Sequence, residues 1–454
     1  MVRYEQVKNW ILIGLVALSL VLTWELWTFQ PDFDSPDRDN LTTPDTLVGG
    51  RSLSIQDVIA AEALVVHDGD DYYMIPADSE SYRDTYQRIF RSNIEVEMTP
   101  IGDPFPSEQG EQGLEVIFPT AIPTNVLMRL FINEEDEIMV PLTAVNRIYI
   151  YQNPNGANMF MQLFSEIDQD MVVLRSNLDY HMFSQNVFNQ VEDFIPAVGV
   201  RELMDEQFKE QLYVPSEPYV GKKLSYTAPS IDIDFFHQLL FPVPSSISES
   251  RQANGERFYT DGSRILTTSS NEDFMDFDFR YPVISEDVTS RHIVDSSFDY
   301  INGHNGWTNS YYLSDWSLLT ETEAKAKYRL QLENLPVIMY EGQDNLMNIQ
   351  VSRVGGQTSR YIRPLFSIES LSFETNTVQL PSGPEMLEGL LEQEFFELDK
   401  VEKMLIGYEM ESSSISYVTI EPHWFIKYEG SWKKLGDSDG ERADTTGENR
   451  DELE

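Results

Sequence analysis

The apolar run from Trp10 to Phe29 constrains this chain more than any other feature, because it has no polar face and only one charge, Glu25. About twenty helical residues rise roughly 30 Å, the thickness of the hydrocarbon core of a bilayer. A buried core helix would be amphipathic, and a cleaved signal would end in small residues rather than in the bulky run from Trp24 to Phe29. We therefore predict an uncleaved transmembrane helix over residues 10–29, with a cleaved signal peptide and a core helix as the alternatives.

The flanking charges predict the orientation of this segment. The bases Arg3 and Lys8 precede it, whereas every charged residue between its end and Arg38 is an aspartate. Positive residues stay in the cytoplasm, so we place the amino terminus inside the cell membrane and the bulk of the chain outside the cell. Residues 1–9 are then a cytoplasmic stub, and the proline- and aspartate-rich residues 30–50 are a linker.

The amino-acid composition excludes some kinds of binding partner and some kinds of chemistry. The net charge is −44, from 76 acidic and 32 basic residues, and such a surface repels nucleic acid. The acids are spread along the chain, which favours solvation in a salty or alkaline medium over a surface for cations or a basic partner. The chain has no cysteine, which excludes disulfides, thiol catalysis and cysteine-bound zinc.

The pattern beyond the linker predicts an α+β fold with antiparallel sheets in three extracytoplasmic domains, 51–195, 196–310 and 311–436. In the first domain we expect hairpins that turn at Asp68-Gly69 and Asn155-Gly156. Apolar residues at helical spacing predict a helix over 79–92, and Asp179 is positioned to cap a closing helix.

The second and third domains share an order of elements. In the second, a helix at 235–240 precedes strands at 257–260, 263–268 and 274–281, the first two joined by a type I′ turn at Asp261-Gly262.

In the third, a capping box of Ser382 and Glu385 begins a helix that extends to Phe395. Three strand-like runs follow: KMLIGYEM, SISYVTI and HWFIKY. We interpret the last two domains as similar helix-plus-meander units. Residues 437–454 carry too few apolar side chains to bury surface and are predicted to be a disordered acidic tail.

The search for chemistry gives no catalytic, cofactor-binding or metal motif. The six histidines lack zinc-motif spacing, and the chain has no G-x-S-x-G, Walker A or G-x-G-x-x-G sequence. Asp68, Asp70 and Asp71 could hold calcium, but they also make an ordinary turn and lack an EF-hand pattern. We therefore expect a protein that is not an enzyme and has no cofactor, and leave calcium binding open.

The aromatic stretch at residues 299–316 allows two interpretations. Trp307, Tyr311 and Trp316 lie among Gly and Asn residues and could line a groove for a ligand or partner. Aromatic side chains also dominate packed cores, so a junction between domains is the alternative interpretation.

The predicted membrane helix has a face suited to a partner helix. Small residues let two helices approach closely, and five positions share one face at steps of three and four: Gly14, Ala17, Leu18, Val21 and Glu25. Glu25 lies near the outer interface, where it could pair with a base or amide of a neighbour. A passive anchor with incidental small residues is the alternative.

Three stretches of the chain resemble the YycH family: NWILIGLVALSLVLTWELWTFQP at the start, YTDGSRIL at 259–266 and GYEMESSSISYVTIEPHWFIKYEGSW at 407–432. The resemblance extends to about residue 436. The family's members are regulators of the WalRK (YycFG) two-component system in low-GC Gram-positive bacteria, with one membrane helix and three external domains. The resemblance implies that the last two domains are alike and are shared with a sister protein, YycI.

The function implied by this resemblance is regulation by association. With a YycI-like partner, such a protein binds a sensor histidine kinase of the WalK/YycG type, partly through membrane helices, and adjusts signal transduction that controls cell-wall metabolism. The acidic tail and the high negative charge depart from the family's pattern. The alternative is a membrane-anchored extracytoplasmic protein that binds cell-wall glycan or peptide.

Overall fold

The computed structural model describes residues 15–19, 47, 49–96, 104–107, 112–132, 138–152, 158–204, 211–282, 291–320, 322–339, 344–369, 372–392, 396–414 and 417–436. Residues 15–19 are helical and belong to a separate unit, Met1–Pro44, whereas the other described residues belong to the unit Asp45–Glu454. Among the described residues, no helix combines the length and the apolar character needed to cross a membrane. The predicted span 10–29 lies outside the described residues except for 15–19, and the predicted tail 437–454 lies outside them entirely.

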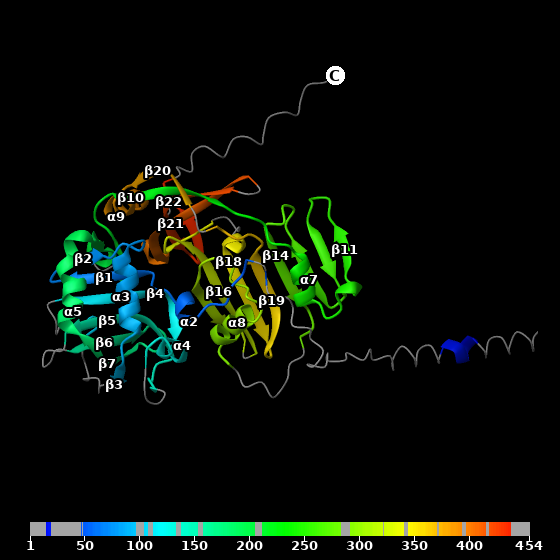
Figure 1. The fold of residues 1–454 in the computed structure, drawn as a ribbon, viewed down its shortest axis with the longest axis horizontal. Helices are drawn as coiled ribbons and strands as arrows, with labels where there is room; N and C mark the ends of the chain where they lie inside the picture. The colour runs from blue at the N-terminus through cyan, green and yellow to red at the C-terminus, as the bar shows by residue number, and fades with distance from the viewer. Residues whose placement is uncertain are drawn as a thin grey trace, which may run out of the picture. The chain divides into compact units, whose positions relative to one another are not determined.

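The N-terminal part of the larger unit is built on one antiparallel sheet (Figure 1). Its strands, in spatial order, are β3 (Ile94–Val96), β7 (Asp170–Asp179), β6 (Asn158–Ser165), β5 (Ala144–Gln152), β4 (Gln112–Pro123), β1 (Ala63–Asp68), β2 (Asp71–Met74), β8 (Ile195–Gly199) and β9 (Tyr213–Pro215). The helices of this part are α2 (Ile55–Val58), α3 (Glu80–Phe90), α4 (Thr124–Met128), α5 (Tyr180–Asn186), η2 (Phe188–Asp193) and α6 (Val200–Leu203).

Local sequence signals account for most of these elements. The hairpin of β1 and β2 is confirmed, with Gly69 at a φ of +61° in its turn. The predicted helix over 79–92 is confirmed as α3, which begins after the N-cap Ser79 and packs Ile89 and Phe90 into the core. Asp179 caps α5 by accepting a hydrogen bond from Met182 N at 2.8 Å, as predicted.

The remaining strands form two further antiparallel sheets among the described residues. One contains β20 (Ser372–Leu380), β10 (Tyr219–Thr227), β22 (Tyr417–Tyr428), β21 (Val401–Ser414) and β23 (Ser431–Lys434). The other contains β11 (Ser248–Arg251), β12 (Arg257–Thr260), β13 (Arg264–Thr268), β14 (Phe274–Phe279), β19 (Gln357–Pro364), β18 (Asn348–Val354), β16 (Glu323–Leu332), β15 (Tyr311–Leu318) and β17 (Leu335–Pro336). The helices are α7 (Asp234–Leu240), η3 (Pro244–Ser246), α8 (Ile293–Asn302), η4 (Asp344–Met347), α9 (Gly383–Leu391) and η5 (Leu398–Lys400).

Both sheets cross the predicted domain boundary at residue 310. In one sheet β14 pairs with β19, and Figure 1 shows these two strands side by side. In the other sheet β10 pairs with both β20 and β22. The ranges 196–310 and 311–436 are therefore joined by backbone hydrogen bonds, and their similarity as repeated units stays a prediction.

Two local predictions of this region need correction. Strands β12 and β13 pair as expected, but Thr260 lies opposite Ile265, so the loop holds four residues and not a two-residue type I′ turn. The Asp261 carboxylate accepts hydrogen bonds from the backbone N–H groups of Ser263 and Arg264, at 2.9 and 2.8 Å, which stabilises this wider loop. Of its residues, only Gly262 has a positive φ.

The runs SISYVTI and HWFIKY belong to one strand, β22, except for residues at the start of the first run. Pro422 lies inside this strand, although proline cannot donate a ladder hydrogen bond. Pairing of β22 with β10 ends at Ile420 and pairing with β23 begins at Phe425, so Pro422 lies where one side of the strand has no ladder.

The C-terminal helix α9 begins as predicted. The Ser382 hydroxyl accepts from Glu385 N, and the Glu385 carboxylate accepts from Ser382 N, which completes the capping box. The helix packs so closely on β9 at Gly383 that a Cβ there would lie only 2.3 Å from Val214 Cγ2. A small apolar cluster therefore joins α9, β9 and strands of the C-terminal sheet: Val200, Leu212, Val214, Leu380, Leu387, Met404 and Trp424.

The last residues of the predicted linker are part of this folded unit. Leu47 is 4% exposed, and its N–H donates to His304 O at 3.2 Å. Arg51 forms a β-bridge with Trp307, and Leu53 N donates to the Asn302 side chain at 2.9 Å. Leu47, Arg51 and Leu53 are thus hydrogen-bonded to the end of α8 and the loop after it.

Candidate functional site

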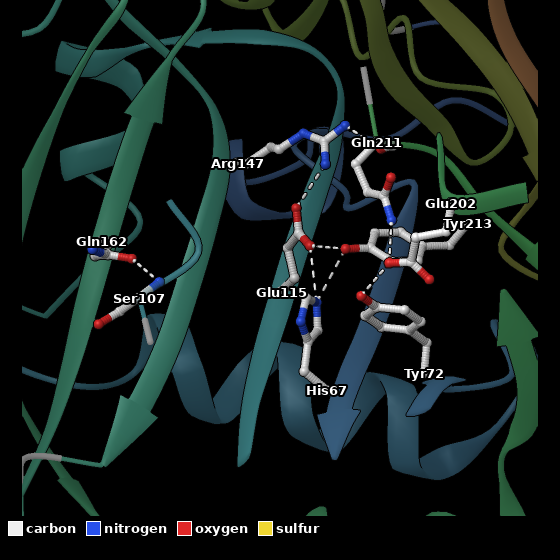
Figure 2. A network of polar contacts seen from close by, with 9 residues as sticks. All are labelled: His67, Tyr72, Ser107, Glu115, Arg147, Gln162, Glu202, Gln211 and Tyr213. Atoms are coloured by element: carbon white, nitrogen blue, oxygen red, sulfur yellow. Dashed lines mark hydrogen bonds and ion pairs between the residues drawn. The ribbon is translucent and has the colours of Figure 1, made fainter. Parts of the chain in front are cut away.

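The N-terminal sheet carries an unusual polar cluster on one of its faces. Alternate residues of β4 face opposite sides, and Leu114 and Val116 join the main apolar core, whereas Glu115 does not. Glu115 is 0% exposed on the other face, and three side chains surround it: His67 from β1, Arg147 from β5 and Tyr213 from β9. We call these four residues the junction network (Figure 2).

The register of the strands brings the network together. Glu115 lies opposite Val65 and Tyr149, so His67 and Arg147 are its diagonal neighbours on β1 and β5. Gly113, opposite His67, leaves the space that the aromatic rings need, because a Cβ there would lie 2.1 Å from the Tyr149 hydroxyl.

Every partner of the Glu115 carboxylate is at hydrogen-bond distance. His67 Nε2 lies 3.0 Å from Oε2, Tyr213 OH donates to Oε2 at 2.8 Å, and Arg147 Nη1 donates to Oε1 at 2.8 Å. Arg147 is only 7% exposed, so this is a buried ion pair. A buried charge is tolerated when it is paired and hydrogen-bonded, as it is here.

The network keeps its charges near neutral pH. Burial raises the pKa of Glu115, but the bonds from His67, Arg147 and Tyr213 outweigh it and lower the pKa to about 2. Burial and the neighbouring carboxylate hold the pKa of Tyr213 well above its usual value, so the phenol remains a donor. Glu115 is thus a permanent hydrogen-bond acceptor at pH 7, which suits a structural role.

The network fixes the segment that connects the N-terminal sheet to the rest of the chain. Arg147 Nη2 donates to Gln211 O at 2.6 Å, and Tyr72 OH donates to Glu202 Oε1 at 2.6 Å (Figure 2). Strand alternation directs Tyr213 toward the network, while its neighbours Leu212 and Val214 join the apolar cluster with α9. The described residues of 200–215, which we call the connector, are therefore held on both sides.

A second contact region surrounds Trp316. Its Nε1 donates to Ala121 O at 2.6 Å, and its ring meets His292 edge to face at 4.5 Å. Nearby, the Asp295 carboxylate pairs with Arg129 and accepts from the Asn125 amide at 3.0 Å. Trp316 therefore lies where β4 and α4 meet α8 and β15.

The other two residues of the predicted groove are interior. Trp307 is 0% exposed, and its Nε1 donates to Asn302 Oδ1 at 2.8 Å. Tyr311 is also fully buried and accepts from the Asn309 amide at 3.1 Å. This burial favours the packed-junction interpretation of the aromatic stretch, because a ligand groove needs exposed rings.

The predicted membrane-helix face lies largely outside the described residues. Gly14, Val21 and Glu25 are outside them, whereas Ala17 and Leu18 lie in the helical residues 15–19 and are exposed. Their role in contact with a partner helix stays a prediction.

The junction network was not predicted from the sequence, in which His67 is one of six histidines without zinc-motif spacing. A weak signal was present, since Glu115 and Arg147 each interrupt an apolar strand. That signal does not show which charges will meet. Among the described residues, no group of three or more His, Cys, Asp or Glu side chains is arranged to hold a metal ion.

The geometry defines a class: an antiparallel α+β protein in which a buried polar cluster joins two parts of the chain. The sequence of this chain matches two protein-family models: "YycH protein, N-terminal domain" over residues 5–196 and "YycH protein, C-terminal domain" over residues 209–437. The chain belongs to the YycH family. The connector and its junction network thus lie where the two family domains meet.

Individual relatives agree with this assignment. The chain is 22% identical over 447 residues to the "Two-component system WalR/WalK regulatory protein YycH" of Bacillus subtilis (strain 168), covering 94% of this chain and 95% of the relative. The crystal structure of YycH from Bacillus subtilis matches with a TM-score of 0.69 at 17% identity, over 87% of this chain and 99% of that one. The second likeness supports the fold.

Proposed function

We propose that this protein is a non-enzymatic, membrane-anchored regulator that modulates a sensor histidine kinase of the WalK/YycG type, together with a YycI-like partner. The observation that carries the proposal is the match to the YycH family along nearly the whole chain, with a relative named as a WalR/WalK regulatory protein. The system would control cell-wall metabolism, as the family resemblance implies.

The location in this proposal is the cell membrane, with a cytoplasmic N-terminus and the bulk of the chain outside. It rests on the apolar run at residues 10–29 and the basic residues before it. The regulator would act by preferring one of two kinase states, since a ligand shifts an equilibrium only by its differential affinity. A tenfold shift requires about 1.4 kcal/mol, which a few helix–helix contacts can supply.

The attachment of Leu47 and Arg51 supports a route between the outer part and the proposed membrane helix. Leu47 and Arg51 are hydrogen-bonded to the loop after α8. A conformational change in that loop would therefore displace the chain at the C-terminal end of the predicted linker, which leads to the predicted membrane helix.

Co-purification from membranes tests the proposal. We expect the double variant Gly14→Leu, Ala17→Leu to recover several-fold less kinase than the wild type, because bulky side chains block close helix approach. The matched control Leu12→Ile, Val16→Leu alters apolar residues outside the predicted face and should leave recovery unchanged. Undiminished kinase recovery with the first variant, at equal levels of folded protein, would contradict the docking face.

A photo-crosslinking residue at position 17 or 21 tests the partner directly in intact cells. We expect crosslinks to the kinase or to the YycI-like protein. Recovery of a soluble, functional form that begins after Trp27 would contradict the membrane anchor.

A further inference from the structure

A hollow of about 430 Å³ lies where α3, the end of β7 and α5 meet, away from the junction network. The buried side chains of Leu178 and Phe183 supply apolar lining. Four charged residues line the same space: Asp84, Arg88, Arg91 and Asp179. The volume falls in the usual range of small-molecule sites, which is about 300–1,000 Å³.

The four charged side chains of this hollow have no ion-pair partner within the described part of the chain, although Asp179 also caps α5. Among the described residues, Asp84, Arg88, Arg91 and Asp179 form no ion pair with one another or with any other side chain. By contrast, Arg147 of the N-terminal sheet is paired with Glu115. Two unpaired charges of each sign therefore face one space.

Rigid elements hold these groups. Arg88 and Arg91 are three positions apart on α3 and its C-cap, so they project from neighbouring positions of the helix. Asp179 is fixed by its capping bond to Met182 N, which engages Oδ1. Charged groups on packed elements lose less conformational freedom on binding than groups on free loops.

We propose that this hollow binds a zwitterionic amino acid or short peptide. Its carboxylate would contact Arg88 and Arg91, its ammonium group would contact Asp84 and Asp179, and its apolar part would lie over Leu178 and Phe183. Charge-assisted hydrogen bonds of this kind are the strong ones, and guanidinium groups match carboxylate geometry. A polyanion is disfavoured, because the chain's net charge of −44 repels it.

This inference does not depend on the proposed regulation of a kinase. Binding can be measured on the isolated full-length chain in detergent, so failure of either proposal leaves the other intact.

Titration calorimetry with defined probes tests the ligand class. We expect alanine and the dipeptide Ala-Ala to bind saturably, and N-acetylalanine and alanine amide to bind roughly tenfold more weakly, because each lacks one charge. Equal binding of all four probes, or no saturable heat up to about 10 mM, would overturn the proposal.

Variants assign each end of the ligand to its side chains. Arg88→Gln should lower the affinity for alanine roughly tenfold but leave the affinity for alanine amide unchanged, because the amide has no carboxylate for Arg88 to contact. Asp179→Asn should weaken alanine but leave N-acetylalanine unchanged, and asparagine still caps α5. The matched control Arg83→Gln lies on the same helix outside the hollow and should bind like the wild type.

The pattern across probes separates binding from folding. A misfolded variant would lose affinity for every probe. In that case the comparison of alanine with N-acetylalanine and alanine amide on the wild-type protein still tests whether the hollow binds both charges of the ligand. If Arg83→Gln weakened alanine as much as Arg88→Gln, or if Arg88→Gln weakened the amide equally, the assigned contacts would be wrong.

Discussion

Replacing Glu115 by glutamine tests whether the junction network holds the connector to the N-terminal sheet. The amide keeps the shape of the side chain but removes the charge that Arg147 meets at 2.8 Å. Arg147 is only 7% exposed, so its guanidinium would stay desolvated without an ionic partner. Breaking one side of a buried pair costs about 3–5 kcal/mol. We expect Glu115→Gln to lower the free energy of unfolding by about 3 kcal/mol, since Arg147 keeps its bond to the Gln211 carbonyl.

The same variant should change the pH dependence of stability. The pKa of Glu115 is lowered from 4.5 to about 2 in the folded protein, where His67, Arg147 and Tyr213 outweigh the effect of burial. A carboxyl group with a lowered folded pKa stabilises the protein above its unfolded pKa, and this stability is lost as the pH falls toward the folded pKa. The lowering corresponds to on the order of 3 kcal/mol. The stability difference between wild type and variant should therefore shrink between pH 4.5 and 2.

Urea denaturation of the full-length chain in detergent, followed by circular dichroism, measures this loss. Trypsin cleavage after Arg201, an exposed residue of the connector, should also become faster in the variant. The control is Glu95→Gln, which removes an exposed ion pair with Arg175 on the same sheet and should cost less than about 1 kcal/mol. If both variants denatured at the same urea concentration at pH 7, the reasoning about buried charge would be refuted.

The remaining predictions concern packing. Trp307→Ala should lower the free energy of unfolding by about 3–5 kcal/mol in thermal or urea denaturation, because the ring is fully buried. Unchanged stability of this variant would contradict the prediction. Gly383→Ala should cost about 1–3 kcal/mol, because its Cβ would meet Val214 at 2.3 Å. Gly389→Ala, in the same helix with nothing within 4 Å, should instead stabilise by about 0.5–1 kcal/mol. Ser382→Ala should cost about 1 kcal/mol through loss of the helix cap, and an unchanged melting temperature would contradict the capping box.

Several local features whose partners are close along the chain could be predicted from the sequence. The capping box at Ser382, the cap of Asp179 and the hairpin at Gly69 involve groups within a few residues of one another. The loop after Thr260 shows where such reasoning stops. Its Asp-Gly pair fits a two-residue turn, but the Asp261 carboxylate instead binds two backbone N–H groups and widens the loop.

Long-range partners could not be read in the same way. The pairing of β14 with β19 joins residues 82 to 90 positions apart, from Asp278 with Arg360 to Phe274 with Pro364, and no local pattern distinguishes this pairing from the expected separate meanders. The burial of Trp307 was likewise undecided, since an aromatic residue among Gly and Asn suits a groove as well as a core.

The apolar N-terminal segment, the antiparallel α+β character, the caps at Ser382 and Asp179 and the hairpin at Gly69 follow from composition and from spacings of two to four residues. The contacts of Glu115 with His67, Arg147 and Tyr213, and the common hollow of Arg88 and Asp179, become visible only in the folded chain. Such meetings depend on strand register and on which faces pack together. Both are set by the burial of the whole core, which no short window of sequence contains.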